Sequence, residues 1–188
     1  MKTGLGLYRK YRMLYAYLNL FRFWMRNFFG GFDIANQFLQ RVDKFSIQLI
    51  LKKHGAKIGA NCDIETGLIF HNCKNYSNLI IGNNCHIGKN CFFDLRDKLI
   101  IHNNVVISMQ CSFITHIDLS KSELSKKYPS KQSPIIIKNN CYVGARSSVF
   151  MGVELGMNSI IAAGSTVPIN AEQNSLIGGV PAKFIKLI

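Results

Sequence analysis

Residues 137–167 read IKNNCY VGARSS VFMGVE LGMNSI IAAGST V, with an aliphatic side chain at every sixth position. A period of six matches neither the 3.6-residue face of a helix nor a hairpin meander, and it indicates a chain that turns the same corner after each short strand. The residue after each aliphatic one is mostly small, as at Gly144, Gly156 and Ala162. The stretch therefore predicts a parallel β-helix in which each flat face is one hexapeptide long.

The six-residue spacing also runs upstream of residue 137. It recurs in two regular blocks, separated by a two-residue slip, and in a looser first block. Its positions are Ile58, Ile64, Phe70, Ile81, Ile87, Phe93, Ile101, Ile107 and Phe113. Since three hexapeptides make one three-sided coil, the pattern predicts a mainly β domain of about five coils.

A long insertion interrupts the repeat before residue 137. From Phe113 to Ile137 the chain runs 24 residues, which is one ordinary hexapeptide and 18 more. Loops of more than about 12 residues in a compact domain are usually functional or disordered. We therefore expect a protruding loop at 117–135 on a β-helix domain at 54–188, which follows a helical segment at 1–53.

The amino-terminal segment is basic and rich in aromatic residues. Of the net charge of +13, residues 1–53 contribute ten Lys or Arg against two acidic residues. Nine aromatic side chains lie between residues 8 and 29, and Asp33, after Gly30 and Gly31, is expected to cap a second helix that runs to about Lys53. The segment is expected to cover the open end of the β-helix, to contact an anionic membrane surface through residues 8–29, or to do both.

The six cysteines show neither a disulfide framework nor a metal-binding spacing. Free Cys behaves as a small buried side chain, and reduced thiols indicate a cytoplasmic location. Five occupy inward corners where other coils have Ser or Val: Cys62, Cys85, Cys91, Cys111 and Cys141. The apolar stretch 13–21 is too short to span a membrane and lacks a signal-peptide cleavage site. Any membrane contact is therefore expected at the inner face.

Over residues 55–188 the chain resembles the hexapeptide-repeat acyltransferases. The resemblance is carried by VGARSSVFMGVELGMNSIIAAGSTVP, by GGVPAKFI and by FITHID before the loop. It is greatest for the branch that O-acetylates saccharides, including precursors of surface polysaccharides. It implies a left-handed β-helix that acts as a homotrimer, with acetyl-CoA as acyl donor and direct transfer of the acetyl group to a sugar hydroxyl.

His116 is the expected general base. An imidazole that titrates near neutral pH can accept the proton of a hydroxyl group as the hydroxyl attacks a thioester. The family's catalytic His maps onto His116 through the THxD pattern, and Asp118 or Glu123 is expected to hold its second ring nitrogen. His71, in GLIFHN, resembles a catalytic His of serine acetyltransferases, but the second His of those enzymes is replaced here by KQSP.

The resemblance also implies an acetyl-CoA site in a groove between two β-helices. The family positions fall on two corners and on one residue near the carboxyl end: Gly144, Ala145, Arg146, Ser147, Ala162, Ala163, Gly164 and Lys183. Lys183 is expected to meet the nucleotide phosphates, with Arg146 as a second cation, and small residues let the pantetheine arm approach the backbone. The corners of a β-helix require small residues as well, so both explanations remain open.

Other functions remain open. N-acylation of a nucleotide-linked amino sugar, or a serine acetyltransferase-like reaction, would use the same site. A non-enzymatic scaffold or a zinc-type β-helix is a different class, but zinc needs three converging ligands, and the spacing of His86 and His102 does not supply them. No metal is expected, and without an RNA- or DNA-reading motif no nucleic acid is expected either.

Overall fold

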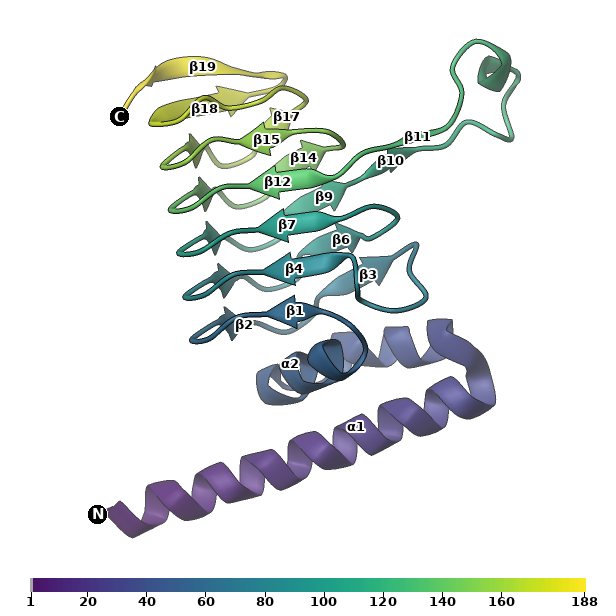
Figure 1. Ribbon diagram of the computed structural model, residues 1–188, viewed down its shortest axis with the longest axis vertical. Helices are drawn as coiled ribbons and strands as arrows, with labels where there is room; N and C mark the ends of the chain where they lie inside the picture. The colour runs from purple at the N-terminus through teal and green to yellow at the C-terminus, as the bar shows by residue number, and fades with distance from the viewer. Residues whose placement is uncertain (1) are drawn as a thin grey trace.

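The computed structural model describes residues 2–188 and shows a three-sided parallel β-helix with helices at its amino-terminal end (Figure 1). One side comprises β1 (Lys57–Ile58), β4 (Leu79–Ile81), β7 (Leu99–Ile101), β12 (Ile135–Ile137) and β15 (Glu154–Leu155). The second comprises β2 (Asp63–Ile64), β5 (His86–Ile87), β8 (Val106–Ile107), β13 (Tyr142–Val143), β16 (Ile160–Ile161), β18 (Ser175–Gly179) and β19 (Ala182–Leu187). The third comprises β3 (Ile69–His71), β6 (Phe92–Asp94), β9 (Ser112–Ile114), β14 (Ser148–Phe150) and β17 (Thr166–Val167).

The residues at the six-residue spacing fill the interior of the β-helix. From Ile64 to Val167 each of them is at most 4% exposed, because parallel strands in register place equivalent side chains directly above one another. In the third sheet Phe93 stacks between Phe70 and Phe113, with ring centroids 5.5 Å apart on each side. The periodic pattern therefore describes the core.

One corner of the β-helix is built from a ladder of asparagines. Each has a positive φ, between 55° and 61°, which Asn tolerates better than most residues. Each of the first five side-chain amides donates to the amide oxygen of the Asn one coil further on, over 2.7–3.3 Å. The ladder consists of Asn61, Asn84, Asn104, Asn140, Asn158 and Asn174.

The cysteines are free thiols. Of the five at the inward corners, four are buried and Cys62 is half-buried against the core. Their sulfurs lie within hydrogen-bonding distance of corner carbonyls, as between Cys91 and Ser108 and between Cys111 and Gly144 (both 3.3 Å). They take the structural place that the repeat predicts.

A hairpin leaves the prism after β9 and projects away from it (Figure 1). Its strands are β10 (His116–Ile117) and β11 (Lys131–Gln132), which pair antiparallel, with His116 opposite Gln132. Its far end carries the short 3-10 helix η2 (Glu123–Lys126). His116 is thus the first residue of the hairpin, at the edge of the regular coils.

The helical segment differs from the expected two-helix arrangement. Helix α1 (Lys2–Phe38) is interrupted at Gly31, whose φ of 80° and ψ of 170° are not helical, and the 3-10 helix η1 (Leu39–Arg41) follows it. Helix α2 (Lys44–Lys53) is capped by Asp43, whose side chain accepts hydrogen bonds from the amides of Phe45 and Ser46. The expectation that Asp33 caps a helix running to Lys53 is therefore wrong, because the chain turns a second time at residues 42–43.

The helices cover the open end of the first coil (Figure 1). Phe23 of α1 and Ile47 and Ile50 of α2 are fully buried in the same core as the β-helix residues. At the junction, the ammonium of Lys44 lies 3.0 Å from Asp63 and 3.4 Å from Glu65. No helix in the part of the chain described has the length and apolar character to cross a membrane.

Candidate active site

The imidazole of His116 is paired with a carboxylate on the neighbouring strand. His116 Nδ1 lies 2.5 Å from Oδ2 of Asp94, the last residue of β6. The side chain of Asp94 is 1% exposed and that of His116 is 17% exposed. An ionised carboxylate only accepts hydrogen bonds, so Nδ1 carries the proton in this pair and the neutral ring keeps its lone pair on Nε2.

Asp94 is held as a carboxylate by several donors. Its Oδ2 accepts hydrogen bonds from the amide and the hydroxyl of Thr115, each at 2.9 Å, and its Oδ1 accepts from the Asn72 amide at 3.0 Å. Burial pushes the pKa of Asp94 upward, but the hydrogen bonds from His116, Asn72 and Thr115 outweigh it and keep this pKa below its ordinary value. Asp94 therefore stays ionised beside His116 at neutral pH.

The residues expected to hold His116 lie elsewhere. The carboxylate of Asp118 accepts hydrogen bonds from the Ser120 amide, Arg96 and the Ser130 hydroxyl at 2.9–3.0 Å, and these contacts lower its pKa. Glu123 pairs with Lys126 in η2, 2.5 Å away. The expectation that either residue orients His116 is wrong, because the hairpin carries both away from the prism, while Asp94 lies one coil back beside Thr115.

A signal for Asp94 was present in the repeat. Asp94 directly follows Phe93, at the position that small residues fill at Gly144, Gly156 and Ala162. An acidic residue in such a buried place needs compensating donors. Recognising it depends on knowing which residue of the next coil stacks beside it, and the irregular spacing at 97–98 hides that register.

Asn72 and His71 lie beside the pair, at the end of β3. The Asn72 side-chain nitrogen is 3.5 Å from Nε2 of His116, and its own backbone has a φ of 53°. The ring of His71 packs near Phe92, with centroids 5.8 Å apart. Within residues 2–188, His71 makes no hydrogen bond to His116 or Asp94, so the structure offers no pairing between the two histidines.

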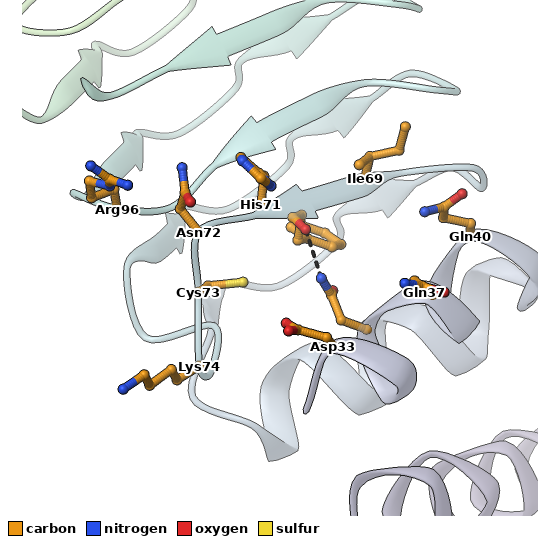
Figure 2. Close-up of a pocket in the computed structure, with 11 residues that line it drawn as sticks. Asp33, Gln37, Gln40, Ile69, His71, Asn72, Cys73, Lys74 and Arg96 are labelled. Atoms are coloured by element: carbon orange, nitrogen blue, oxygen red, sulfur yellow. Dashed lines mark hydrogen bonds between the residues drawn. The ribbon is translucent and has the colours of Figure 1, made fainter. Parts of the chain in front are cut away.

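A pocket of about 660 Å³ opens next to Asn72, between the end of α1 and β3 (Figure 2). It is lined by Asp33, Asn36, Gln37, Gln40, Ile69, Phe70, His71, Asn72, Cys73, Lys74 and Arg96. The lining is rich in side-chain amides, and Asn36 is fixed by donating to the Phe70 carbonyl over 2.7 Å. Burial, with the nearby charges of Asp33 and Asp94, raises the pKa of Cys73 to about 11, so that its sulfur is a thiol at neutral pH.

The pocket reaches the His116–Asp94 pair through two shared residues. Asn72 contacts both members of the pair. The backbone amide of Arg96 donates to Asp94 over 3.3 Å. A ligand in the pocket would therefore lie one side chain away from His116.

The residues expected to bind acetyl-CoA lie on successive coils. A Cβ on Gly144 would lie 2.5 Å from the Ala163 nitrogen, and one on Gly178 would lie 2.7 Å from the Ala162 Cβ, so these corners stack closely. Lys183 is exposed on β19, opposite Gly178. The structure thus brings the corner at 144–147, the corner at 162–164 and Lys183 to one column of the β-helix, in which Gly144 and Ser147 are buried while Arg146, Ala163, Gly164 and Lys183 are exposed.

Individual members of this column differ in what they can offer a ligand. Ser147 is fully buried, and its hydroxyl donates to the Ala162 carbonyl and accepts from the Ser165 amide. Its hydroxyl therefore serves the fold and does not reach a ligand on the surface. Arg146 has a φ of 59° and donates to the Gln110 side chain over 2.9 Å. At Gly164, with a φ of 71°, a Cβ would meet open space. The need for Gly at 144 is therefore explained by packing, whereas Gly164 borders free surface.

Comparisons with known proteins agree with this architecture. Residues 78–108 and 134–168 match the family model described as the hexapeptide repeat of succinyl-transferase. The chain is 28% identical over 145 residues to a galactoside O-acetyltransferase of Escherichia coli strain K12, covering 74% of this chain and 67% of that protein. A galactoside O-acetyltransferase of Lactococcus lactis strain IL1403 is 26% identical over 138 residues, covering 70% of this chain and 63% of that protein.

Solved structures with the same fold include a maltose O-acetyltransferase from Clostridium difficile 630, with a TM-score of 0.72 and 22% identity, over 81% of this chain and 82% of that one. A galactoside acetyltransferase in complex with coenzyme A has a TM-score of 0.70 and 24% identity, over 95% of this chain and 82% of that one. The β-helix is thus the left-handed one of these neighbours. The chain thus carries the hexapeptide repeat and is similar to acetyltransferases built on it. The sequence matches span about two thirds of the galactoside O-acetyltransferases' length.

Within the described part of the chain, no three His, Cys, Asp or Glu side chains converge as metal ligands. His86 has a single acidic neighbour, Asp63, at 3.3 Å. A structural or catalytic zinc site needs three or four ligands, so the described residues do not offer one to zinc.

Proposed function

We propose that this protein transfers the acetyl group of acetyl-CoA directly to a hydroxyl group of a sugar or of a surface-polysaccharide precursor. The observation that carries the proposal is the buried Asp94 carboxylate against His116 Nδ1, with the opposite ring nitrogen 3.5 Å from the side-chain nitrogen of Asn72, a residue that lines the amide-rich pocket. The family relationship supports the donor, since relatives are named acetyltransferases and one structural neighbour holds acetyl-CoA.

In this reaction His116 is the general base. Its Nε2 takes the proton from the acceptor hydroxyl while the oxygen attacks the thioester carbonyl. As the tetrahedral intermediate collapses, the carbon–sulfur bond breaks and the CoA sulfur takes the proton from the imidazolium. Asp94 stabilises the imidazolium during the interval, and positioned proton transfer of this kind typically accelerates a reaction by about 10²–10⁴-fold.

The pocket chemistry favours a polyhydroxylated acceptor. Side-chain amides both donate and accept hydrogen bonds, which suits the several hydroxyl groups of a sugar. Four such amides line the pocket, on Asn36, Gln37, Gln40 and Asn72, and Asp33 adds an acceptor. The amides of Asn36 and Asn72 are also hydrogen-bonded within the fold, so Gln37 and Gln40 are the ones free to bind a ligand among the described residues. An amino sugar would fit the same lining, so N-acylation remains the alternative that an acceptor panel must separate from O-acetylation.

The acetyl-CoA site of the proposal is the column of Gly144–Ser147, Ala162–Gly164 and Lys183, whose exposed members include Arg146, Ala163, Gly164 and Lys183. A trimer, as in the family, would place this column against a neighbouring β-helix and form the groove for the pantetheine arm. Light scattering at several protein concentrations tests this assembly, and a monomer that retains full acetyl-CoA turnover would remove the trimer from the proposal.

Helix α1 supports a peripheral contact with the membrane. Between residues 8 and 29 it exposes Tyr8, Tyr11, Leu14, Tyr15, Tyr17, Leu18, Phe21, Trp24, Phe28 and Phe29. No acidic residue precedes Asp33. Exposed aromatics beside basic residues are typical of interfacial helices, and we propose that α1 lies on an anionic leaflet at the inner face of the membrane.

Vesicle sedimentation tests the membrane contact. The double substitution Phe28→Ser and Phe29→Ser should abolish sedimentation with phosphatidylglycerol vesicles, because both rings are exposed by 69% or more. Phe184→Ser is the matched control, since that ring is 56% exposed on β19. If both variants sediment like the native protein, the aromatic surface of α1 does not bind lipid.

Release of CoA thiol tests the chemistry. The native protein and His116→Ala are compared with acetyl-CoA and a panel of free sugars, amino sugars, serine and sugar derivatives. The proposal predicts thiol release that requires a hydroxyl acceptor and falls by a hundredfold or more in His116→Ala, with CoA binding retained. Turnover that survives in His116→Ala would remove His116 as the base, and transfer to amines alone would favour the N-acyl alternative.

A further inference from the structure

A second cavity adjoins the amide-lined pocket at the bend of α1. It has a volume of about 480 Å³ and is lined by Arg26, Ile34, Gln37, Phe38, Gln40 and Arg41. Gln37 and Gln40 also line the first pocket, so the two cavities meet across these side chains. Figure 2 shows both glutamines on the helical side of the first pocket. The second cavity is therefore the neighbour of the first on the side of Gln37 and Gln40.

The second cavity is lined by two arginines and no acidic residue. Within residues 2–188, neither Arg26 nor Arg41 forms a salt bridge. Arg26 lies over the Phe38 ring at 4.2 Å and donates to the Arg22 carbonyl over 3.2 Å, contacts that position its guanidinium without neutralising it. Asp33 is the only acidic residue in the linings of the two cavities, and it lines the first.

The bend that creates the cavity is specified by a glycine in the sequence. Gly31 adopts a φ of 80°, which few residues other than Gly adopt without strain. The bend turns the segment of Ile34 and Phe38 back against the first part of α1, so that Arg26 and Arg41, 15 positions apart in the sequence, line one cavity. A straight helix would separate them along its axis.

We infer that the acceptor is a sugar joined to a phosphate or diphosphate, with the sugar in the amide-lined pocket and the phosphate between Arg26 and Arg41. Guanidinium groups bind phosphate through paired, charge-assisted hydrogen bonds. The inference rests on the proposed function, because it assigns the acceptor of that same reaction. A sugar still joined to phosphate has yet to be transferred to its final glycan, so acetylation would precede glycosyl transfer.

Binding of inorganic pyrophosphate tests the arginine site without depending on turnover. Calorimetric titrations are made in saturating CoA, so that the CoA phosphate site is already filled. Arg41→Gln and Arg26→Gln should each weaken pyrophosphate binding by tenfold or more, and Arg41→Lys should recover part of it. Arg22→Gln, one turn from Arg26 and outside the cavity lining, is the matched control and should bind as the native protein does.

Three results would overturn the inference: no pyrophosphate binding to the native protein, binding that neither arginine substitution weakens, and an equal loss in Arg22→Gln. Circular dichroism melts of each variant accompany the titrations. The lysine variant keeps a charge in place, so a loss in Arg41→Gln that Arg41→Lys recovers reports on the charge and not on folding.

An acceptor panel then identifies the source of the phosphate. It contains galactose, galactose 1-phosphate, UDP-galactose and galactose on a short prenyl diphosphate. The ratio of kcat/KM for a phosphorylated acceptor over galactose should be at least ten and should fall toward one in Arg41→Gln; a ratio near one in the native protein contradicts the inference. Preference for UDP-galactose indicates a nucleotide carrier, and preference for the prenyl compound indicates a lipid carrier.

Failure of this inference is distinguishable from failure of the proposed function. If galactose is acetylated in a His116-dependent manner but pyrophosphate does not bind, the acetyltransferase stands and the phosphate site is wrong. If pyrophosphate binds through Arg41 but thiol release does not require His116, the anion site stands and the catalytic assignment is wrong.

Discussion

Replacing Asp94 by Asn tests the central pair of the site. The substitution preserves shape but removes the negative charge that faces the His116 imidazolium in the transition state. For two unit charges about 4 Å apart at an effective dielectric constant of about 20, the interaction is worth about 4 kcal/mol. At about 1.4 kcal/mol per tenfold in rate, Asp94→Asn should lower kcat by about 10³, with little change in acetyl-CoA binding.

The assay is initial-rate thiol release for Asp94→Asn, His116→Ala and the double variant. If Asp94 acts through His116, Asp94→Asn should cost less than about threefold once the imidazole is gone, since interacting residues are non-additive. Asp118→Asn is the matched control, because Asp118 binds Arg96 and the hairpin and forms no hydrogen bond with His116 within the described residues. A thousandfold loss that persists in the His116→Ala background would refute the positioning role of Asp94.

Three further predictions concern stability. Phe93→Ala removes a ring that is 1% exposed between Phe70 and Phe113 and should lower the free energy of unfolding by about 3–5 kcal/mol in urea titrations; a loss below 1 kcal/mol would contradict the stacked core. Asn140→Ala removes two ladder hydrogen bonds at a residue with a φ of 61°, so it should lower the free energy of unfolding by about 1–3 kcal/mol. Asn140→Gly should lower it less, because Gly adopts that φ without strain. An equal loss in both variants would assign the effect to the ladder hydrogen bonds alone. The folded-state pKa of Asp94 lies below its ordinary value, so its ionisation stabilises the fold above about pH 4, and this contribution is lost as pH falls through the folded-state pKa. Asp94→Asn should therefore flatten the acid limb of a plot of melting temperature against pH. An unchanged acid limb would contradict the lowered pKa.

The core could be predicted residue by residue because it repeats. The burial of Ile81, Phe93 and Val149 is predicted from their spacing alone, since each coil places the equivalent side chain in the same environment. The corner cysteines followed from the same reasoning. His116 was found as the residue at which the repeat gives way to the hairpin, together with a motif shared with the family.

The partner of His116 could not be predicted in this way. Asp94 lies 22 positions before it, and the slip at residues 97–98 separates the two from any simple multiple of the repeat. Asp118 is two positions away but is carried outward by β10. Proximity in sequence favoured the wrong carboxylate, because hydrogen bonds between coils join residues of different strands.

The sequence by itself determined the three-sided β-helix, the place of its protruding loop and the interior of the prism, because a strict period leaves one way to bury the aliphatic column. Only the tertiary structure decided which carboxylate orients the imidazole, where the helices bend, and how two cavities meet beside Gln37. These features depend on contacts between segments that no local pattern relates. Asp94 contacts His116 across a coil, and Arg26 and Arg41 line one cavity on either side of the bend at Gly31.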